Sequence, residues 1–354
     1  MRRRSFSAGL LGLGALTLAR PALAQGTNEN RAKLIEGARR EGSLSYWDTV
    51  IQPETNDALT EGFRKAYDLP SSFQVNYTLS NTGNLVTRVE QEIAAQRATI
   101  DIASIASPTW VFEKVEGGNI LEYHSPEYEH YGRVFEASMG QKGYFAFNGA
   151  YMFVPMWNGD TQDFKVASWR DVPGLLKPGR FSLGDATISA SYLATFMGLR
   201  KVLGDDYFRE LAKLKPNFLV RSEQIASRLV SNQDMFAVFG QPTRALQNNE
   251  RGASLKFAHP NEGVVLMPQC SFILKQAPHP NAAKLWIDYV LSPEAQAILA
   301  KREAMSSGRA AFQSPVPDYA PNIEGMKLVD LDWRALSTED MQKAREDWRK
   351  IFSG

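Results

Sequence analysis

Two serines, Ser189 and Ser191, follow a predicted strand at residues 180–183 and open a predicted helix. The free N–H groups and the dipole of a helix N-terminus favour a negative charge, and serine hydroxyls add hydrogen-bond donors. This spacing predicts a binding site for an anion. The same serines also suit simple helix capping, which requires no ligand.

Similar candidates follow other predicted strands. Trp47 and Asp48 stand where the strand 43–47 ends, so the indole can stack on a ligand and the carboxylate can bind an amine. Partial core burial of Trp47 and turn capping by Asp48 are the alternatives. Thr82 and Ser107 each stand at the start of a predicted helix and offer a hydroxyl beside free amides, although both also suit capping.

The second half of the chain adds three candidate binding residues. Arg221 ends a predicted strand and can pair with a carboxylate or phosphate through two hydrogen bonds, or remain a solvated surface residue. Gln241 follows the apolar strand 234–239 and can bind a neutral or anionic group, or lie in a surface loop. Glu262 precedes the apolar run 264–274, where it contacts a ligand or only fixes the connection.

The sequence has no pattern typical of a catalytic or metal site. Its four histidines do not have the spacing of metal ligands, and glycine-rich nucleotide motifs and the G-x-S-x-G elbow are absent. We therefore expect no enzyme activity, no cofactor and no metal. The single cysteine, Cys270, cannot form an internal disulfide and is predicted to be a buried structural thiol.

Strands that alternate with helices of 10–15 residues predict an α/β protein with mainly parallel sheets, in which ligands bind beyond the carboxyl ends of the strands. The predicted strands are 43–47, 73–79, 100–105, 180–183, 234–239 and 264–274. The predicted helices are 28–41, 54–68, 85–93, 108–116, 189–204, 205–215, 242–251, 281–291 and 293–303, followed by an amphipathic helix at the C-terminus.

The N-terminus reads as an export signal. Arg2, Arg3 and Arg4 precede an apolar run that is too short to span a bilayer, and Ala22-Leu23-Ala24 fits a signal peptidase site. We expect residues 1–24 to be a signal peptide, cleaved after Ala24, and the mature protein to be periplasmic. The arginine pair before Ser5-Phe6 favours the twin-arginine route.

Length and charge limit the possible functions further. The 354 residues are enough for two domains. Removal of the signal peptide takes away four of the 40 basic residues, so the mature chain has 36 basic and 39 acidic residues. Such a balance gives no electrostatic reason to expect nucleic acid as a partner.

The motifs of the C-terminal half resemble family 1 extracellular solute-binding proteins, and among them the ferric-ion periplasmic components of ABC transporters. The resemblance rests on P-N-E-G at 260–263, Q-A-P-H-P-N-A-A-K at 276–284 and S-P-E-A-Q at 292–296. It implies a type II periplasmic-binding-protein fold with a ligand cleft between two lobes. We expect lobe 1 to comprise residues 25–150 and about 262–303, and lobe 2 residues 151–261 and about 304–354.

One departure from this family bears on the ligand. The ferric members hold iron through adjacent tyrosines after the strand that corresponds to 234–239, whereas this chain has Gln241-Pro242-Thr243 there. A ferric ion needs anionic oxygen ligands, so a small organic or phosphorylated anion is the favoured solute. The resemblance implies a monomeric receptor that serves an inner-membrane ABC permease. A sensor component, a ferric-ion carrier and an enzyme on the same scaffold are the alternatives.

Overall fold

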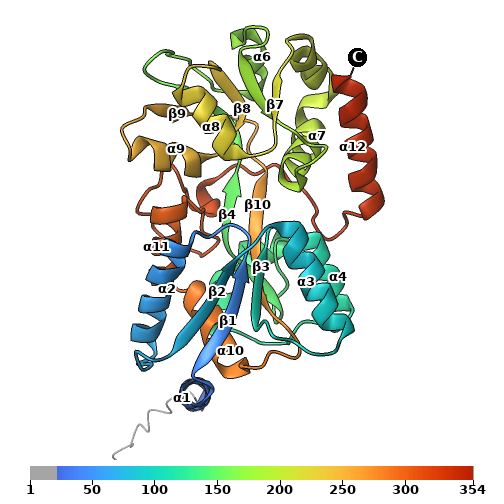
Figure 1. The fold of residues 1–354 in the computed structure, drawn as a ribbon. Helices are drawn as coiled ribbons and strands as arrows, with labels where there is room; N and C mark the ends of the chain where they lie inside the picture. The colour runs from blue at the N-terminus through green and yellow to red at the C-terminus, as the bar shows by residue number, and fades with distance from the viewer. Residues whose placement is uncertain (1–21, 354) are drawn as a thin grey trace, which may run out of the picture.

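The computed structural model describes residues 22–353. Residues 1–21 of the predicted signal peptide lie outside the described residues, so its cleavage and its export route remain predictions. None of the described helices is long and apolar enough to cross a membrane. The molecule has two lobes, each built on one five-stranded sheet (Figure 1).

The first lobe contains the sheet β2-β1-β3-β10-β4, in which β1, β2 and β3 are parallel and β10 runs antiparallel to both β3 and β4. Its strands are β1 (Ser43–Asp48), β2 (Gln74–Leu79), β3 (Ile102–Ile105), β4 (Phe145–Met152) and β10 (Leu266–Ile273). Its helices are α1 (Ala22–Glu41), α2 (Pro53–Ala66), α3 (Thr82–Ala94), α4 (Pro108–Glu116), α5 (Gly132–Glu136), α10 (Pro280–Val290) and α11 (Pro293–Glu303).

The second lobe repeats this plan around the sheet β7-β6-β8-β5-β9, with β6, β7 and β8 parallel. Its strands are β5 (Val154–Asn158), β6 (Phe181–Gly184), β7 (Asn217–Leu219), β8 (Phe236–Gly240) and β9 (Leu255–Phe257). Its helices are α6 (Val172–Leu175), α7 (Ala190–Lys213), α8 (Ser222–Val230), α9 (Pro242–Asn249) and α12 (Thr338–Phe352). Three short 3-10 helices are η1 (Pro126–His130), η2 (Trp169–Asp171) and η3 (Ile323–Gly325).

The predicted boundary between two helices at Gly204 is present as a sharp kink within α7. Gly204 has the non-helical angles φ 77° and ψ 173°, which only glycine adopts without strain, and two helical segments meet there. The helix α12 packs on α7, where Trp348 contacts Phe196 with ring centroids 5.0 Å apart and Asp347 pairs with Arg200 at 2.7 Å. The C-terminal helix is therefore part of the second lobe.

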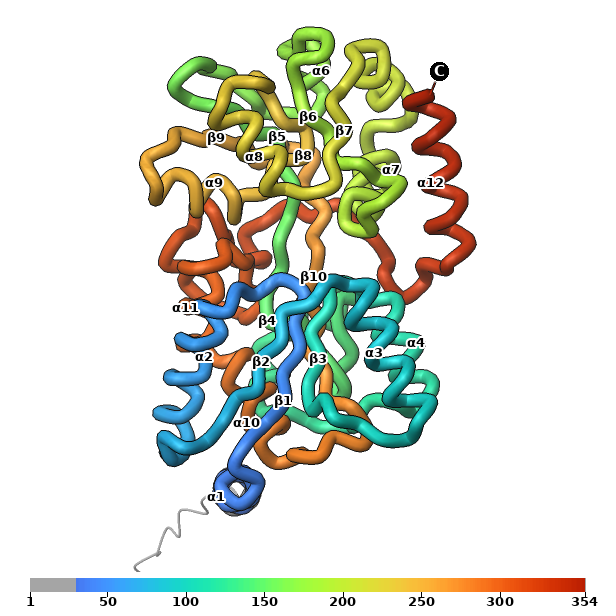
Figure 2. The backbone as a smooth tube through the Cα atoms, in the orientation of Figure 1, coloured from blue at the N-terminus to red at the C-terminus, as the bar shows by residue number. Residues whose placement is uncertain are grey.

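The chain crosses between the lobes three times. Only Phe153 separates β4 from β5, residues 258–265 lead from β9 to β10, and the segment after α11 returns to α12 (Figure 2). Two details differ from the predicted boundaries. The strand β4 extends in the first sheet to Met152, and residues 306–310 bond to the first lobe, since Ser306 pairs with Ala150 and Ala310 N–H donates to His130.

The interior is continuous and aromatic. In the first lobe, Phe63 packs edge-on against Trp286 with ring centroids 5.1 Å apart, and neither side chain is exposed. Cys270 lies wholly inside the same core, and burial raises the pKa of its thiol well above its usual value. A thiol in this setting is inert, which agrees with the predicted structural role.

Candidate functional site: the cleft between the lobes

The loops that follow the parallel strands of both sheets meet between the lobes. Ser107, after β3, and Ala190, after β6, line one cavity of about 30 Å³. Gln52, which follows β1, lines another pocket together with Glu223 and Arg244, which follow β7 and β8. The strand ends therefore form the inter-lobe face, which is where open α/β sheets bind ligands.

The first turn of α7 is the best-defined part of this face. Ser189 is the N-cap, and its hydroxyl accepts the N–H of Tyr192 at a long 3.4 Å. Ser191 shares a 2.8 Å hydrogen bond with the hydroxyl of Tyr151, which lies on β4 beside the crossover. Both predicted serines are half-buried at a helix N-terminus, so their hydroxyls and the adjacent amides can meet an anion.

Tyr192 continues this surface into the second lobe. Its ring lies 4.5 Å from that of Phe153, and its hydroxyl is buried without a hydrogen-bond partner among the described residues. Burial raises the pKa of Tyr192, Glu223 adds to this effect and Arg244 opposes it. These charges therefore lie within electrostatic range of the start of α7.

Asp48 is held inside the first lobe. Its carboxylate accepts the hydroxyl of Tyr46 at 2.7 Å and the N–H groups of Val50 at 2.6 Å and Ile51 at 2.8 Å. Burial is the main cause that raises its pKa, and these bonds oppose the rise. Asp48 thus fixes the turn after β1, as the capping alternative predicts, while the neighbouring Trp47 is half-buried on the other face of the strand.

Two residues beside this turn were not among the sequence candidates. Gln269 is completely buried on β10 and donates to the hydroxyl of Thr49 at 3.1 Å. This bond joins the loop after β1 to the strand that crosses from the second lobe. A single amide inside the apolar run 264–274 is the sequence signal that could have indicated it, because buried polar groups need a partner.

The remaining candidates of the first lobe differ in their settings. Ser107 is the N-cap of α4, makes no capping bond with its side chain, and faces α7 across the small cavity. Thr82 lies in an exposed first turn, where Asn81 is the actual cap and accepts the N–H of Asn84 at 2.9 Å. Ser107 is therefore placed between the lobes, and Thr82 lies on the surface.

Gln241 is the N-cap of α9 and is only 7% exposed. Its side chain makes no capping hydrogen bond at the start of α9. Its amide can therefore serve a ligand, as expected from the sequence.

Arg221 and Glu262 each interact with nearby residues of the protein. Arg221 is 69% exposed in its side chain and lies 3.6 Å from Glu223. Glu262 accepts the hydroxyl of Ser168 and the N–H of Trp169, the latter at 3.1 Å. Burial alone would raise the pKa of Glu262, but these hydrogen bonds outweigh it and lower the pKa. The geometry of Glu262 matches the alternative of fixing the connection before β10.

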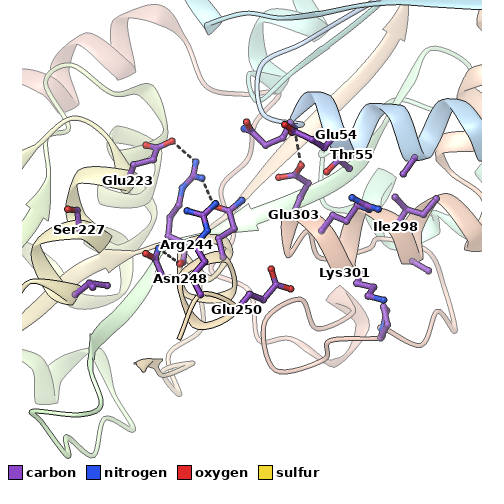
Figure 3. A pocket seen from close by; sticks show the side chains of 18 of the residues that line it. Glu54, Thr55, Glu223, Ser227, Arg244, Asn248, Glu250, Ile298, Lys301 and Glu303 are labelled. Atoms are coloured by element: carbon purple, nitrogen blue, oxygen red, sulfur yellow. Dashed lines mark hydrogen bonds and ion pairs between the residues drawn. The ribbon is translucent and has the colours of Figure 1, made fainter. Parts of the chain in front are cut away.

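A pocket of about 1330 Å³ opens beside the strand ends, between α2 and α11 of the first lobe and α8 and α9 of the second. We call it the side pocket. Figure 3 shows Glu223, Arg244 and Asn248 on one wall and Glu54, Thr55 and Glu303 on the other. None of the nine predicted site residues lines it.

The described residues contain no group of three histidine, cysteine, aspartate or glutamate side chains that could hold a metal ion. The loop after β8 likewise presents Gln241 and Thr243 where the iron-binding pattern requires tyrosines. The site therefore consists of hydroxyls, amides and helix N-termini, beside a pocket lined by both charges.

These features define a two-lobed binding protein with a ligand cleft. The family described as bacterial extracellular solute-binding protein matches residues 51–302, and the chain belongs to it. An uncharacterised protein of Haemophilus influenzae is 25% identical over 309 residues, which are 82% of this chain and 86% of that protein.

Two solved structures support the fold. The periplasmic binding protein AfuA from Actinobacillus pleuropneumoniae, with fructose-6-phosphate bound, has a TM-score of 0.70 at 17% identity, over 88% of this chain and 98% of that one. Iron-bound HitA from Pseudomonas aeruginosa has a TM-score of 0.68 at 16% identity, over 87% and 99%. The two-lobed periplasmic-binding fold predicted from the sequence is confirmed.

Proposed function

We propose that this solute-binding protein captures a small organic or phosphorylated anion between its lobes in the periplasm and delivers it to an inner-membrane ABC permease. The proposal that the solute is an anion rests on the first turn of α7, where Ser189 and Ser191 present hydroxyls beside backbone amides. A helix N-terminus of this kind favours negative charge without a buried cation.

The surroundings support an anion over a ferric ion. Gln241 offers an amide where tyrosinate oxygens would be needed, and a hard cation prefers anionic oxygen ligands. The related fold of AfuA holds a phosphorylated sugar, whereas that of HitA holds iron. The residues after β8 in this chain fit the first kind of ligand.

The proposed mechanism involves binding and closure, without bond breaking. A solute that touches both lobes stabilises their closed arrangement over the open one by its difference in affinity for the two. A permease can then recognise the closed form of the monomer.

Native mass spectrometry of the protein purified from the periplasm tests this proposal, because a tightly bound solute survives purification. We expect a retained phosphate ester or carboxylate, which mild denaturation releases for identification. Retained iron, or an amine without an acidic group, would overturn the anion assignment.

A further inference from the structure

The side pocket places opposite charges on its two walls. Arg244, from α9 of the second lobe, and Glu303, the last residue of α11 in the first lobe, face the pocket from opposite sides (Figure 3). Glu303 is only 3% exposed, and the side chain of Arg244 is 17% exposed. Charged groups at such depth normally have partners, because burial of an unpaired charge is costly.

Arg244 keeps bonding capacity toward the pocket. It donates to Ser222 at 3.1 Å, to Gln247 at 2.7 Å and to Glu223 at 2.7 Å. These bonds hold the guanidinium in place and use three of its roughly five N–H donors. Its other donors bond to no residue of the part of the chain that the structure describes, and they can bind an anionic group of a ligand.

Glu303 has similar capacity on the opposite wall. Its carboxylate accepts the N–H of Gln52 at 2.9 Å and a hydrogen bond from the side chain of Thr55, whereas a carboxylate accepts up to about four hydrogen bonds. Its main-chain carbonyl accepts the hydroxyl of Thr243 from the second lobe at 2.7 Å, which fixes the distance between the walls at this point. Burial raises the pKa of Glu303, although the hydrogen bonds from Thr55 and Gln52 oppose the rise. A ligand cation would therefore stabilise the ionised carboxylate.

The whole lining has nearly balanced charge. Five glutamates and four arginine or lysine side chains surround the pocket. A simple polyanion would meet as much repulsion as attraction there, whereas a molecule with both charges would find partners for each. The walls also belong to different lobes, so one such molecule would join them.

We propose that the solute is dipolar: its anionic group binds Arg244 and its ammonium group binds Glu303 across the side pocket. This inference rests on the proposed function for the kind of solute, a small anion held between the lobes, and narrows it to amine-bearing phosphate esters or carboxylates. It places the anionic group at Arg244, which is the alternative to the first turn of α7. The two charges then account for closure, since each lobe supplies one partner.

The experiment uses the mature protein and matched pairs of probes that differ in one amine. The pairs are ethanolamine phosphate with ethyl phosphate, glucosamine 6-phosphate with glucose 6-phosphate, and β-alanine with propionate. Isothermal titration calorimetry gives each affinity. We expect at least one amine-bearing probe to bind about 10-fold or more tightly than its partner, which corresponds to one good charged hydrogen bond.

Two variants locate the effect. Glu303→Gln should remove the preference for the amine without weakening the amine-free probe, because the amide keeps the bond from Gln52 but loses the negative charge. Glu294→Gln, on the exposed part of the same wall, should retain the preference. Equal binding within every pair, or a preference that survives Glu303→Gln, overturns the dipolar solute but leaves an anion receptor. Binding of no phosphate or carboxylate probe overturns the proposed function, and this inference with it.

Discussion

The hydroxyls of Tyr151 and Ser191 lie 2.8 Å apart and share a hydrogen bond that joins the crossover strand β4 to the first turn of α7. Tyr151 is buried, and burial raises the pKa of its hydroxyl, so it remains a neutral donor or acceptor. The bond therefore orients Ser191 at the helix N-terminus that we propose as the anion site.

Ser191→Ala should weaken solute binding by about fivefold to 10-fold, because one hydrogen bond contributes about 1 kcal/mol and the backbone amides of α7 remain. Calorimetric titration with the retained solute measures the change. Ser72→Ala, an exposed serine in the turn before β2, is the matched control and should bind as the wild type does. Unchanged affinity in Ser191→Ala would place the anion away from the start of α7, with Arg244 of the side pocket as the alternative position.

Asp234 should be among the most costly polar residues to replace in the second lobe. It is wholly buried, pairs with Arg228 through contacts of 2.6 and 3.0 Å, and accepts the amide of Asn217 at 2.7 Å. Asp234→Ala leaves these donors without a partner, so we expect a loss of about 3 kcal/mol in the free energy of unfolding. Urea denaturation measures it. Asp163→Ala, which removes an exposed pair with Lys165, should leave the midpoint unchanged.

Hydrophobic periodicity predicted most of the elements, including β1, β2, β8, β10 and α12, because each buries one face or a continuous apolar run. It missed β4, whose residues Phe145–Met152 are buried on both faces and show no alternation. It also missed β9, which is three residues long, and α8. Their assignment depends on neighbours in the sheet that a local pattern does not contain.

The residues of the candidate site likewise fall into those that a local sequence pattern predicts and those that depend on tertiary packing. The place of Ser189 and Ser191 in the fold could be predicted because a helix start after a strand is a local feature; Ser189 is the N-cap of α7, and Ser191 bonds to Tyr151 of β4. Arg244 and Glu303 could not, since their shared pocket depends on the packing of α9 against the end of α11. Asp48 follows the capping alternative left open by the sequence, because its side chain points inward and closes the turn after β1.

Asp288 should make stability depend on pH. Burial raises its pKa from 3.8 to about 6, despite hydrogen bonds from Ser125 at 2.6 Å and Tyr123 at 2.9 Å. The folded protein therefore binds this proton more tightly than the unfolded chain does, so the contribution of Asp288 to stability falls as the pH rises from about 4 to about 6 and stays lost above that range.

Asp288→Asn tests this dependence, because the amide cannot ionise but can still accept a hydrogen bond. The free energy of unfolding of the variant minus that of the wild type should be larger at pH 7.5 than at pH 4.5, by on the order of 1–2 kcal/mol. Chemical denaturation at the two pH values gives the comparison. The same difference in stability at both values would show that Asp288 titrates alike in the folded and unfolded states.

Gln241 offers a test that separates binding from folding. The residue is only 7% exposed and its side chain makes no capping hydrogen bond, so Gln241→Ala removes no cap of α9. We expect a thermal midpoint close to that of the wild type, together with about 10-fold weaker binding of the solute, since a polar site loses one of its donors.

The sign of the solute's charge at this position follows from a second substitution. Gln241→Glu has nearly the same shape but places a negative charge at the start of α9, where the helix dipole tolerates it in the empty protein. An anion bound nearby would be repelled, so its affinity should fall by about 100-fold or more at low salt and recover in part as salt screens the charges. Tighter binding in Gln241→Glu, measured by the same titration, would mean that a positive group of the solute lies against α9 and that the anionic group binds elsewhere.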